Sequence, residues 1–108
     1  MQPAEQLAQR FLERHPDAAA EQLAALSPAD AAAAMIGLET SAALALFMRL
    51  PPLAAARCLE RLAAEQATAI LAGLPLREGI DVLNRVDPQA REQYLAALPA
   101  RIARPLRI

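Results

Sequence analysis

The sequence has few of the residues from which β-sheets are built. Aromatic residues make up only 3% of the 108 positions, tryptophan is absent, and β-branched residues are scarce. Alanine instead fills 28 positions, and with leucine, arginine, glutamate and glutamine it favours helices. The composition excludes a β-sandwich or a β-barrel, and the length leaves room for one hydrophobic core. We therefore expect residues 1–108 to form a single all-α domain.

Reactive and metal-binding side chains are also rare. Cys58 is the only cysteine and His15 the only histidine, so an internal disulfide is impossible and a zinc site lacks ligands. The chain has no nucleophile elbow and no glycine-rich phosphate loop. Cys58 occupies a repeat position that other repeats fill with apolar residues, so we interpret it as a core residue. These absences argue against an enzyme.

Lysine is missing altogether, and the eleven arginines nearly balance twelve acidic residues, which leaves a net charge of −1. No overall field therefore draws the chain to nucleic acid or to an anionic membrane. Arg49, Pro51 and Pro52 break the longest apolar run before it reaches the roughly 18 residues of a membrane span. The first residues do not resemble a secretory signal. We expect a cytoplasmic chain with no nucleic-acid partner and no direct membrane insertion.

A twelve-residue repeat runs along the chain from His15. In seven complete rows of twelve, the ninth and twelfth places carry no charge, and the fifth place is small except at Arg91. With the eighth place, these positions have the i, i+3, i+4, i+7 spacing of one helix face. The ninth places are Leu23, Met35, Phe47, Leu59, Leu71, Leu83 and Leu95, and the twelfth are Leu26, Leu38, Leu50, Leu62, Leu74, Val86 and Leu98.

Each row begins with the signals of a helix start. Prolines cluster in the first two places, and Ser27 and Asp87 have the chemistry of N-caps. Arginines recur at the eleventh place (Arg49, Arg61 and Arg85), where they complement the helix dipole. Turns are expected near residues 14–16, 26–28, 38–40, 50–52, 62–64, 74–76, 86–88 and 98–100.

The repeat predicts about eight helices of nine or ten residues, each followed by a two- or three-residue turn. Helices this short are marginal alone in water, so each must bury its apolar face against neighbours. Two rows would form one 24-residue helical hairpin. The expected fold is an α-solenoid, a right-handed superhelix of short helices.

Glu78 and Asp81 form a pair of acidic residues three positions apart on one predicted helix, and Asp87 opens the next. Carboxylate oxygens of this kind are suitable ligands for Mg²⁺, which keeps much of its water. The alternative is that Glu78 complements the helix dipole and Asp81 is simply solvated. Two carboxylates should bind Mg²⁺ weakly or not at all in the isolated chain.

Three arginines, Arg101, Arg104 and Arg107, follow one another by one helical turn in a tail that Pro105 is expected to interrupt. Three arginines without flanking aromatics make a weak nucleic-acid footprint. We therefore interpret them as a solvated or partner-facing stripe.

Several segments together resemble the cytoplasmic N-terminal domain of MgtE-type magnesium transporters, and more distantly the helical repeats of the flagellar motor switch protein G family. They are His15-Pro16-Asp17, Ala67 to Leu71, Leu74 to Leu83, and Arg104 to Arg107. The resemblance implies a superhelical regulatory domain that precedes a pair of CBS domains and a membrane channel. It also implies that Mg²⁺, bound between acidic faces of the N-terminal and CBS domains, holds the channel closed.

In the family's pattern an acidic pair is followed by two residues and an aspartate. Here Arg77 stands at the first acid, Glu78 at the second and Asp81 at the third. The resemblance further implies that residues 98–108 lead toward a following domain such as CBS, that the parent is an inner-membrane protein, and that it could be a homodimer. A helical-repeat interaction module with no metal role is the alternative.

Overall fold

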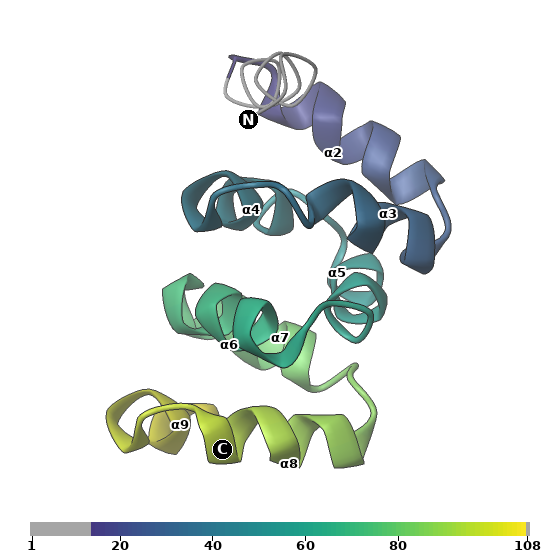
Figure 1. Cartoon of the computed structure of the whole chain (residues 1–108). Coiled ribbons are helices and arrows are strands. Elements are labelled where there is room, and N and C mark those ends of the chain that lie inside the picture. Colours follow the sequence, from purple (N-terminus) through teal and green to yellow (C-terminus); the bar gives the residue numbers. More distant parts are fainter. Residues whose placement is uncertain (1–13, 108) are drawn as a thin grey trace.

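The computed structural model describes residues 14–107, and within this range it contains eight α-helices and no strand (Figure 1). This confirms the all-α prediction. The helices are α2 (Pro16–Ala25), α3 (Pro28–Met35), α4 (Thr40–Phe47), α5 (Pro52–Leu59), α6 (Ala64–Gly73), α7 (Leu76–Leu83), α8 (Pro88–Ala97) and α9 (Ala100–Leu106).

Successive helices start twelve residues apart without exception. A ten-residue helix is followed by two connecting residues and an eight-residue helix by four, so the period is kept by either route. The predicted turn positions are confirmed, including the one at Ala63, where no proline marks the start of α6. The lengths differ from the prediction, because several helices have eight residues and α9 has seven.

The first place of each row is the N-cap. The Ser27 hydroxyl accepts a hydrogen bond from the Asp30 N–H at 3.2 Å, and the Asp87 carboxylate accepts from the N–H groups of Gln89 and Ala90. These bonds satisfy amides that have no partner within the helix. Pro51, Pro75 and Pro99 occupy N-cap positions, and the other row-start prolines lie at the first helical position.

Two eleventh-place arginines act at helix C-termini as predicted. Arg49 and Arg85 each donate a hydrogen bond to the carbonyl four residues earlier, Ala45 at 2.8 Å and Asp81 at 2.9 Å. Each arginine therefore satisfies a carbonyl near the negative end of its helix dipole.

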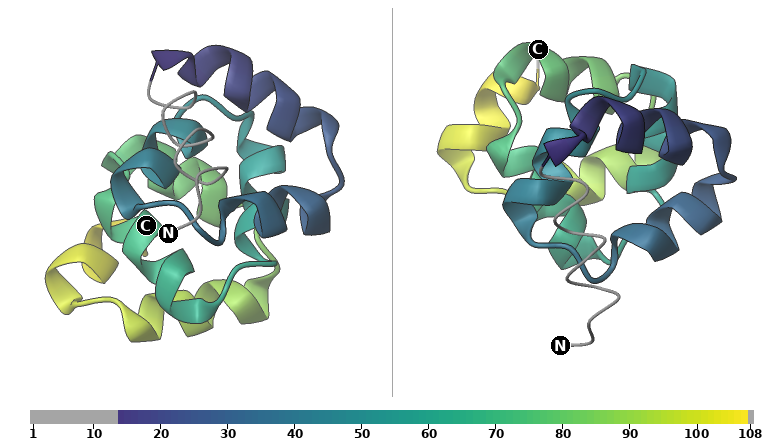
Figure 2. Two further views of the ribbon diagram at one scale, coloured as in Figure 1. Left: turned by 45° about the horizontal axis from the view of Figure 1, so that its top comes forward. Right: turned by 90° about the horizontal axis from the view of Figure 1, so that it is seen from above.

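The helices pack in two lines, which we call helix rows and which differ from the twelve-residue rows of the sequence. Each contacts the helix two places along the chain, which gives one row of α2, α4, α6 and α8 and another of α3, α5, α7 and α9. The stack runs from α2 to α8 and α9 in Figure 1, and the tilted view in Figure 2 shows the same order. The packing pattern therefore repeats every 24 residues, but the predicted hairpin contact within each pair of rows is weak, because most consecutive helices pack less closely than helices two places apart. This arrangement is consistent with a superhelix, whose right-handed sense stays a prediction.

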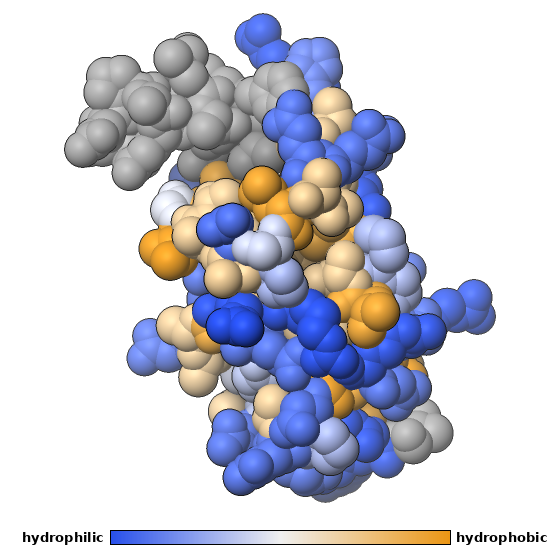
Figure 3. All heavy atoms as spheres, turned by 90° about the vertical axis from the view of Figure 1, so that its right-hand side faces the viewer, coloured by the Kyte–Doolittle hydropathy of each residue, from blue (hydrophilic) through white to orange (hydrophobic). Residues whose placement is uncertain are grey.

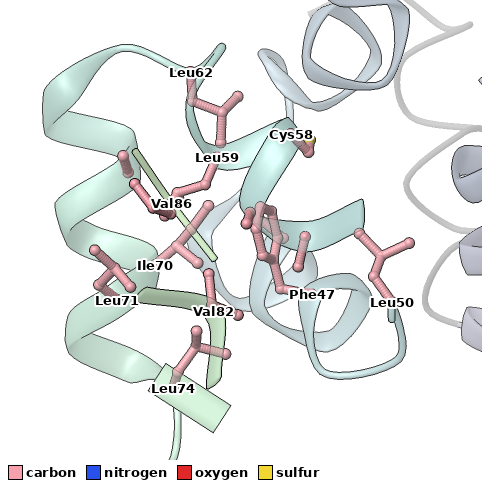
Figure 4. Packing of buried hydrophobic residues seen from close by; sticks show 14 of the residues in the cluster. Phe47, Leu50, Cys58, Leu59, Leu62, Ile70, Leu71, Leu74, Val82 and Val86 are labelled. Atoms are coloured by element: carbon pink, nitrogen blue, oxygen red, sulfur yellow. The ribbon is translucent and has the colours of Figure 1, made fainter. Parts of the chain in front are cut away.

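The ninth-place residues form the centre of the core. All seven are buried, and Met35 and Leu59 are fully enclosed. The eighth-place residues Ile70 and Val82 lie near the ninth-place residues Leu59 and Leu71 between the helices (Figure 4). The fifth place is buried alanine or glycine in α2 to α7, so the backbones approach closely.

Different places on each helix face opposite directions along the stack. In α2 and α3, which have packed helices on only one side within residues 14–107, the fifth and sixth places are buried, but Gln22 and Ala34 at the eighth place are exposed. In α8, at the other end, Tyr94 at the eighth place is buried and Glu92 at the sixth is exposed. The fifth and sixth places therefore face the following layer, and the eighth faces the preceding one.

The twelfth place is less uniform than the sequence suggests. Leu26 is 45% exposed and Leu38 is half-buried, whereas the other five are buried. Leu62 and Leu74 end the repeat rows that contain Leu59 and Leu71. They are buried, but they are more exposed than Leu59 and Leu71, which are almost fully enclosed. The twelfth place lies in the connection after each helix, at the margin of the core, and the first connection lies at the end of the described stack.

Replacing Leu59 with alanine should lower the free energy of unfolding by about 2–5 kcal/mol, because the side chain is fully buried and the change leaves a cavity. Leu53→Ala, on the same helix but at a side chain 55% exposed, is the matched control and should cost less than about 1 kcal/mol. Urea unfolding measures both. Equal losses would contradict the assignment of the ninth place to the core.

Candidate functional site

Helix α7 carries the two acidic residues that the sequence singles out. Glu78 lies in its first turn and Asp81 one turn later, and both are half-buried. Neither carboxylate has a hydrogen bond or an ion pair with other residues of the described range. The neighbouring Arg77 is exposed. The helix therefore presents two unpaired carboxylates on one face, as the three-residue spacing predicts.

Asp87, the third predicted ligand, already has a structural role. One of its carboxylate oxygens caps α8 through two backbone N–H groups, at 3.1 Å from Gln89 and 3.4 Å from Ala90. Its own N–H donates to the Glu60 carboxylate at 3.2 Å. The N-cap prediction for this residue is confirmed.

Between residues 14 and 107, no three histidine, cysteine, aspartate or glutamate side chains come together as a group that could hold a metal ion. Glu78, Asp81 and Asp87 therefore do not form a three-ligand cluster. The chemistry available on α7 is that of two carboxylates, which fit Mg²⁺ only as part of a larger set of oxygen ligands.

A polar network that sequence analysis missed joins two connections of the stack. Arg57 pairs with Glu60 and also donates to the Arg85 carbonyl at 2.9 Å, and Glu60 accepts from the Asp87 N–H. The connection after α5 is thereby tied to the connection after α7. Glu60 and Asp87 are 27 residues apart, so no local pattern could have signalled the contact.

Of the three predicted interface arginines, Arg101 and Arg104 lie on α9 and Arg107 is its C-cap residue, and all three are exposed. Arg107 pairs with Glu92 of α8 at 3.0 Å. The prediction that Pro105 interrupts this segment is wrong, because α9 runs through Pro105 to Leu106. Proline removes one backbone N–H here and the helix ends one residue later, so the loss falls in its last turn.

An apolar groove of about 410 Å³ lies where α2 and α3 meet α5. Two exposed leucines, Leu26 and Leu53, line it, together with Ala54 and Arg57. Figure 3 shows apolar side chains gathering toward this end of the stack and hydrophilic ones toward the other. The sequence did signal it, because Leu53 is an apolar residue outside the helix face that the repeat buries.

The groove and the α7 carboxylates occupy equivalent positions in the repeat. Leu53, Ala54 and Arg57 stand at the third, fourth and seventh places of their row, as Arg77, Glu78 and Asp81 do two rows later. Helices α5 and α7 pack against each other in one row. At the third and fourth places this side therefore changes from apolar on α5 to charged on α7, whereas the seventh place is charged on both helices.

Cys58 is a core residue, as predicted. Its thiol is buried, its sulfur lies 3.5 Å from the Met35 sulfur, and burial raises the pKa of the thiol to about 11. A protonated, enclosed thiol is a poor nucleophile.

Eight short helices at a twelve-residue period define residues 14–107 as a helical-repeat domain. None of the helices in residues 14–107 combines the length and the apolar character needed to cross a bilayer. Over residues 3–107 the chain matches the family described as the MgtE intracellular N domain, and it belongs to that family. Domains of this family are associated with magnesium transporters and are not catalytic. Comparisons with curated proteins and with solved structures give no match.

The thiol of Cys58 should react very slowly with a thiol reagent at pH 8 until the protein unfolds. A shift of the pKa from 9.0 to about 11 lowers the thiolate fraction about a hundredfold at that pH. The raised pKa also predicts that the free energy of unfolding falls as the pH rises from about 9 through about 11, because the unfolded thiol ionises first.

Rates of modification with and without urea, and urea melts across this pH range, measure both effects. Cys58→Val should reduce the alkaline loss without abolishing it, since burial and the nearby Glu60 charge also raise the pKa of Tyr94. Rapid modification of the folded protein would contradict the assignment.

Proposed function

We propose that this chain is the cytoplasmic regulatory domain of an MgtE-type magnesium transporter. The family match over residues 3–107 carries the proposal. In this proposal the domain responds to intracellular Mg²⁺ through an interface with a following domain of the CBS type, and the bound ion favours the closed channel.

Glu78 and Asp81 would be this domain's contribution to the ion site. Their carboxylates are half-buried and have no partner among residues 14–107, so they are available to a ligand from outside the domain. Two carboxylates cannot replace much of the water around Mg²⁺, which makes binding dependent on oxygen ligands from a second domain. Such a site closes only when the two domains meet, and it would therefore report the ion concentration as a change in domain contact.

Packing on both sides of α7 supports this role. The helix lies between α5 and α9, and its C-terminal end is held by the hydrogen bond that Arg85 donates and by the Arg57, Glu60 and Asp87 network. Carboxylates on a helix fixed in this way have little freedom to lose when an ion binds, which lowers the entropic cost of binding.

The apolar groove favours a second candidate, a helical interaction module with no metal role. A groove with two exposed leucines beside α5 would bind an apolar segment of a partner protein whether or not Mg²⁺ is present. The gene itself separates the candidates. CBS and membrane segments encoded after residue 108 support the transporter, and a different following domain or a stop codon supports the module.

Mg²⁺ should have little effect on the thermal stability of the 108-residue chain alone. At a concentration equal to the dissociation constant, a ligand adds only about 0.4 kcal/mol, so millimolar Mg²⁺ should raise the melting temperature by no more than about 3 °C. Calorimetry with and without Mg²⁺ measures this. A larger rise that Glu78→Gln with Asp81→Asn abolishes would show a complete site within the domain.

In the intact transporter, the same double variant should keep Mg²⁺ uptake high at internal concentrations that close the unaltered protein. The reason is that the site between domains loses both charges contributed by α7. Glu65→Gln is the matched control, because Glu65 also lies in the first turn of its helix but is exposed and belongs to the other helix row. If Mg²⁺ uptake by the double variant falls at the same internal concentration as uptake by the control, this result would count against the metal site.

A further inference from the structure

The outer face of the last layer differs in chemistry from every layer before it. In α2 to α7 the fifth and sixth places, which face the following layer, are small or apolar apart from Thr68. In α8 these places hold Arg91 and Glu92, whereas in α9 the fifth place keeps a small residue, Ala103, and the sixth is Arg104. Helices α8 and α9 have packed helices on one side only within the described part of the chain. This face therefore carries charge where the repeat otherwise prepares an apolar contact.

Positive charge predominates on this face. Arg91, Arg104 and Arg107 face a single acid, Glu92, which pairs with Arg107 across the two helices at 3.0 Å. Arg104 is exposed and has no ion pair in the described range. The Nε atom of Arg91 is buried without a hydrogen-bond partner. Two of the three guanidinium groups are thus not neutralised, although the whole chain has a net charge of −1.

A hollow of about 300 Å³ lies between α8 and α9 on this face. Its apolar lining includes Leu95 and Leu98, and Arg104 and Arg107 lie at the same hollow. Arg91 precedes Leu95 by one turn of α8, on the same side of the helix. An apolar cavity with arginines beside it fits one apolar side chain flanked by negative groups.

We propose that this arginine face, formed by Arg91, Arg104, Arg107 and the hollow between α8 and α9, docks an acidic protein segment. An apolar side chain of the segment enters the hollow, and carboxylates on either side accept hydrogen bonds from the guanidinium groups. Arginine is suited to this, because its planar group donates two parallel hydrogen bonds to one carboxylate. The interaction requires neither Mg²⁺ nor the α7 carboxylates, and it does not depend on the transporter function.

Two simpler roles fit the face less well. A polar cap that only ends the helical stack needs charged residues, but it needs neither an excess of one sign nor an apolar hollow. An anionic bilayer would gain only about 1 kcal/mol for each arginine near its surface, and Glu92 occupies one of the three.

The test uses NMR of the isotope-labelled chain with an acetylated and amidated peptide of one leucine between two glutamates. At low ionic strength we expect saturable shifts of the Nε–Hε signals of Arg91, Arg104 and Arg107, with a dissociation constant in the millimolar range. Arg104→Gln with Arg107→Gln should weaken binding about tenfold, because two partly exposed charge pairs are lost. Peptides with glycine for leucine, or glutamine for glutamate, should also bind more weakly, and these need no change in the protein.

Arg61→Gln with Arg77→Gln is the matched control, since it removes the same charge from two exposed positions outside the arginine face. Its peptide affinity should equal that of the unaltered chain. Equal weakening in both double variants, shifts spread over all the arginines, or insensitivity to the leucine would overturn the proposal. Stronger shifts of the same signals with phosphatidylglycerol vesicles than with the peptide would identify a membrane site and overturn it as well.

Discussion

The burial of one large side chain from each twelve-residue row, in a core that neighbouring layers share, is the contact on which the whole molecule depends. A helix of eight or ten residues has too few internal hydrogen bonds to persist alone. Leu59 and its ninth-place equivalents supply much of the missing free energy because they are buried in the core. Since every layer needs its neighbours, stability is a property of the stack rather than of any single helix.

This dependence frees the rest of each helix for other chemistry. The third, fourth and seventh places, outside the buried stripe, hold leucine, alanine and arginine on α5, arginine and two acids on α7, and arginine, isoleucine and proline on α9. None of these changes disturbs the register, because the stripe and the caps alone determine where a helix starts and which side it buries. Residues outside the buried stripe, such as Arg77, can therefore vary with little effect on the fold.

The sequence was sufficient for the local features of the fold. Ser27 and Asp87 mark helix starts by side-chain chemistry, and the period of twelve places every turn, including the one at Ala63 that has no proline. It was insufficient where the outcome depends on position in the stack. Leu26 and Leu50 share one place in the repeat, yet only Leu50 is buried, because neighbouring layers decide exposure and a repeat pattern does not contain them.

The candidate site shows the same division. Two carboxylates on one face of α7 follow from helical geometry, but the contact between Glu60 and Asp87 joins distant rows and could not be foreseen. Arg91 was visible as an exception in a column of small residues, and only the arrangement of layers shows that it lies on the terminal face. Pro105 was overestimated as a helix breaker, because its effect depends on how much helix remains after it.

The pairing of each helix with the second one along the chain has a consequence for how such domains can change in length. Loss or duplication of a single twelve-residue row would transfer every later helix to the opposite helix row, whereas a change of 24 residues would leave each later helix in its own helix row. Helices of both helix rows bury side chains at the same places of the repeat, so the altered stack would still pack. The carboxylates of α7, however, would then belong to the helix row that now contains α6 and α8, on the other side of the domain. Insertion or loss of an even number of twelve-residue rows thus keeps later surface residues on the same side of the domain. An odd number moves them to the other side.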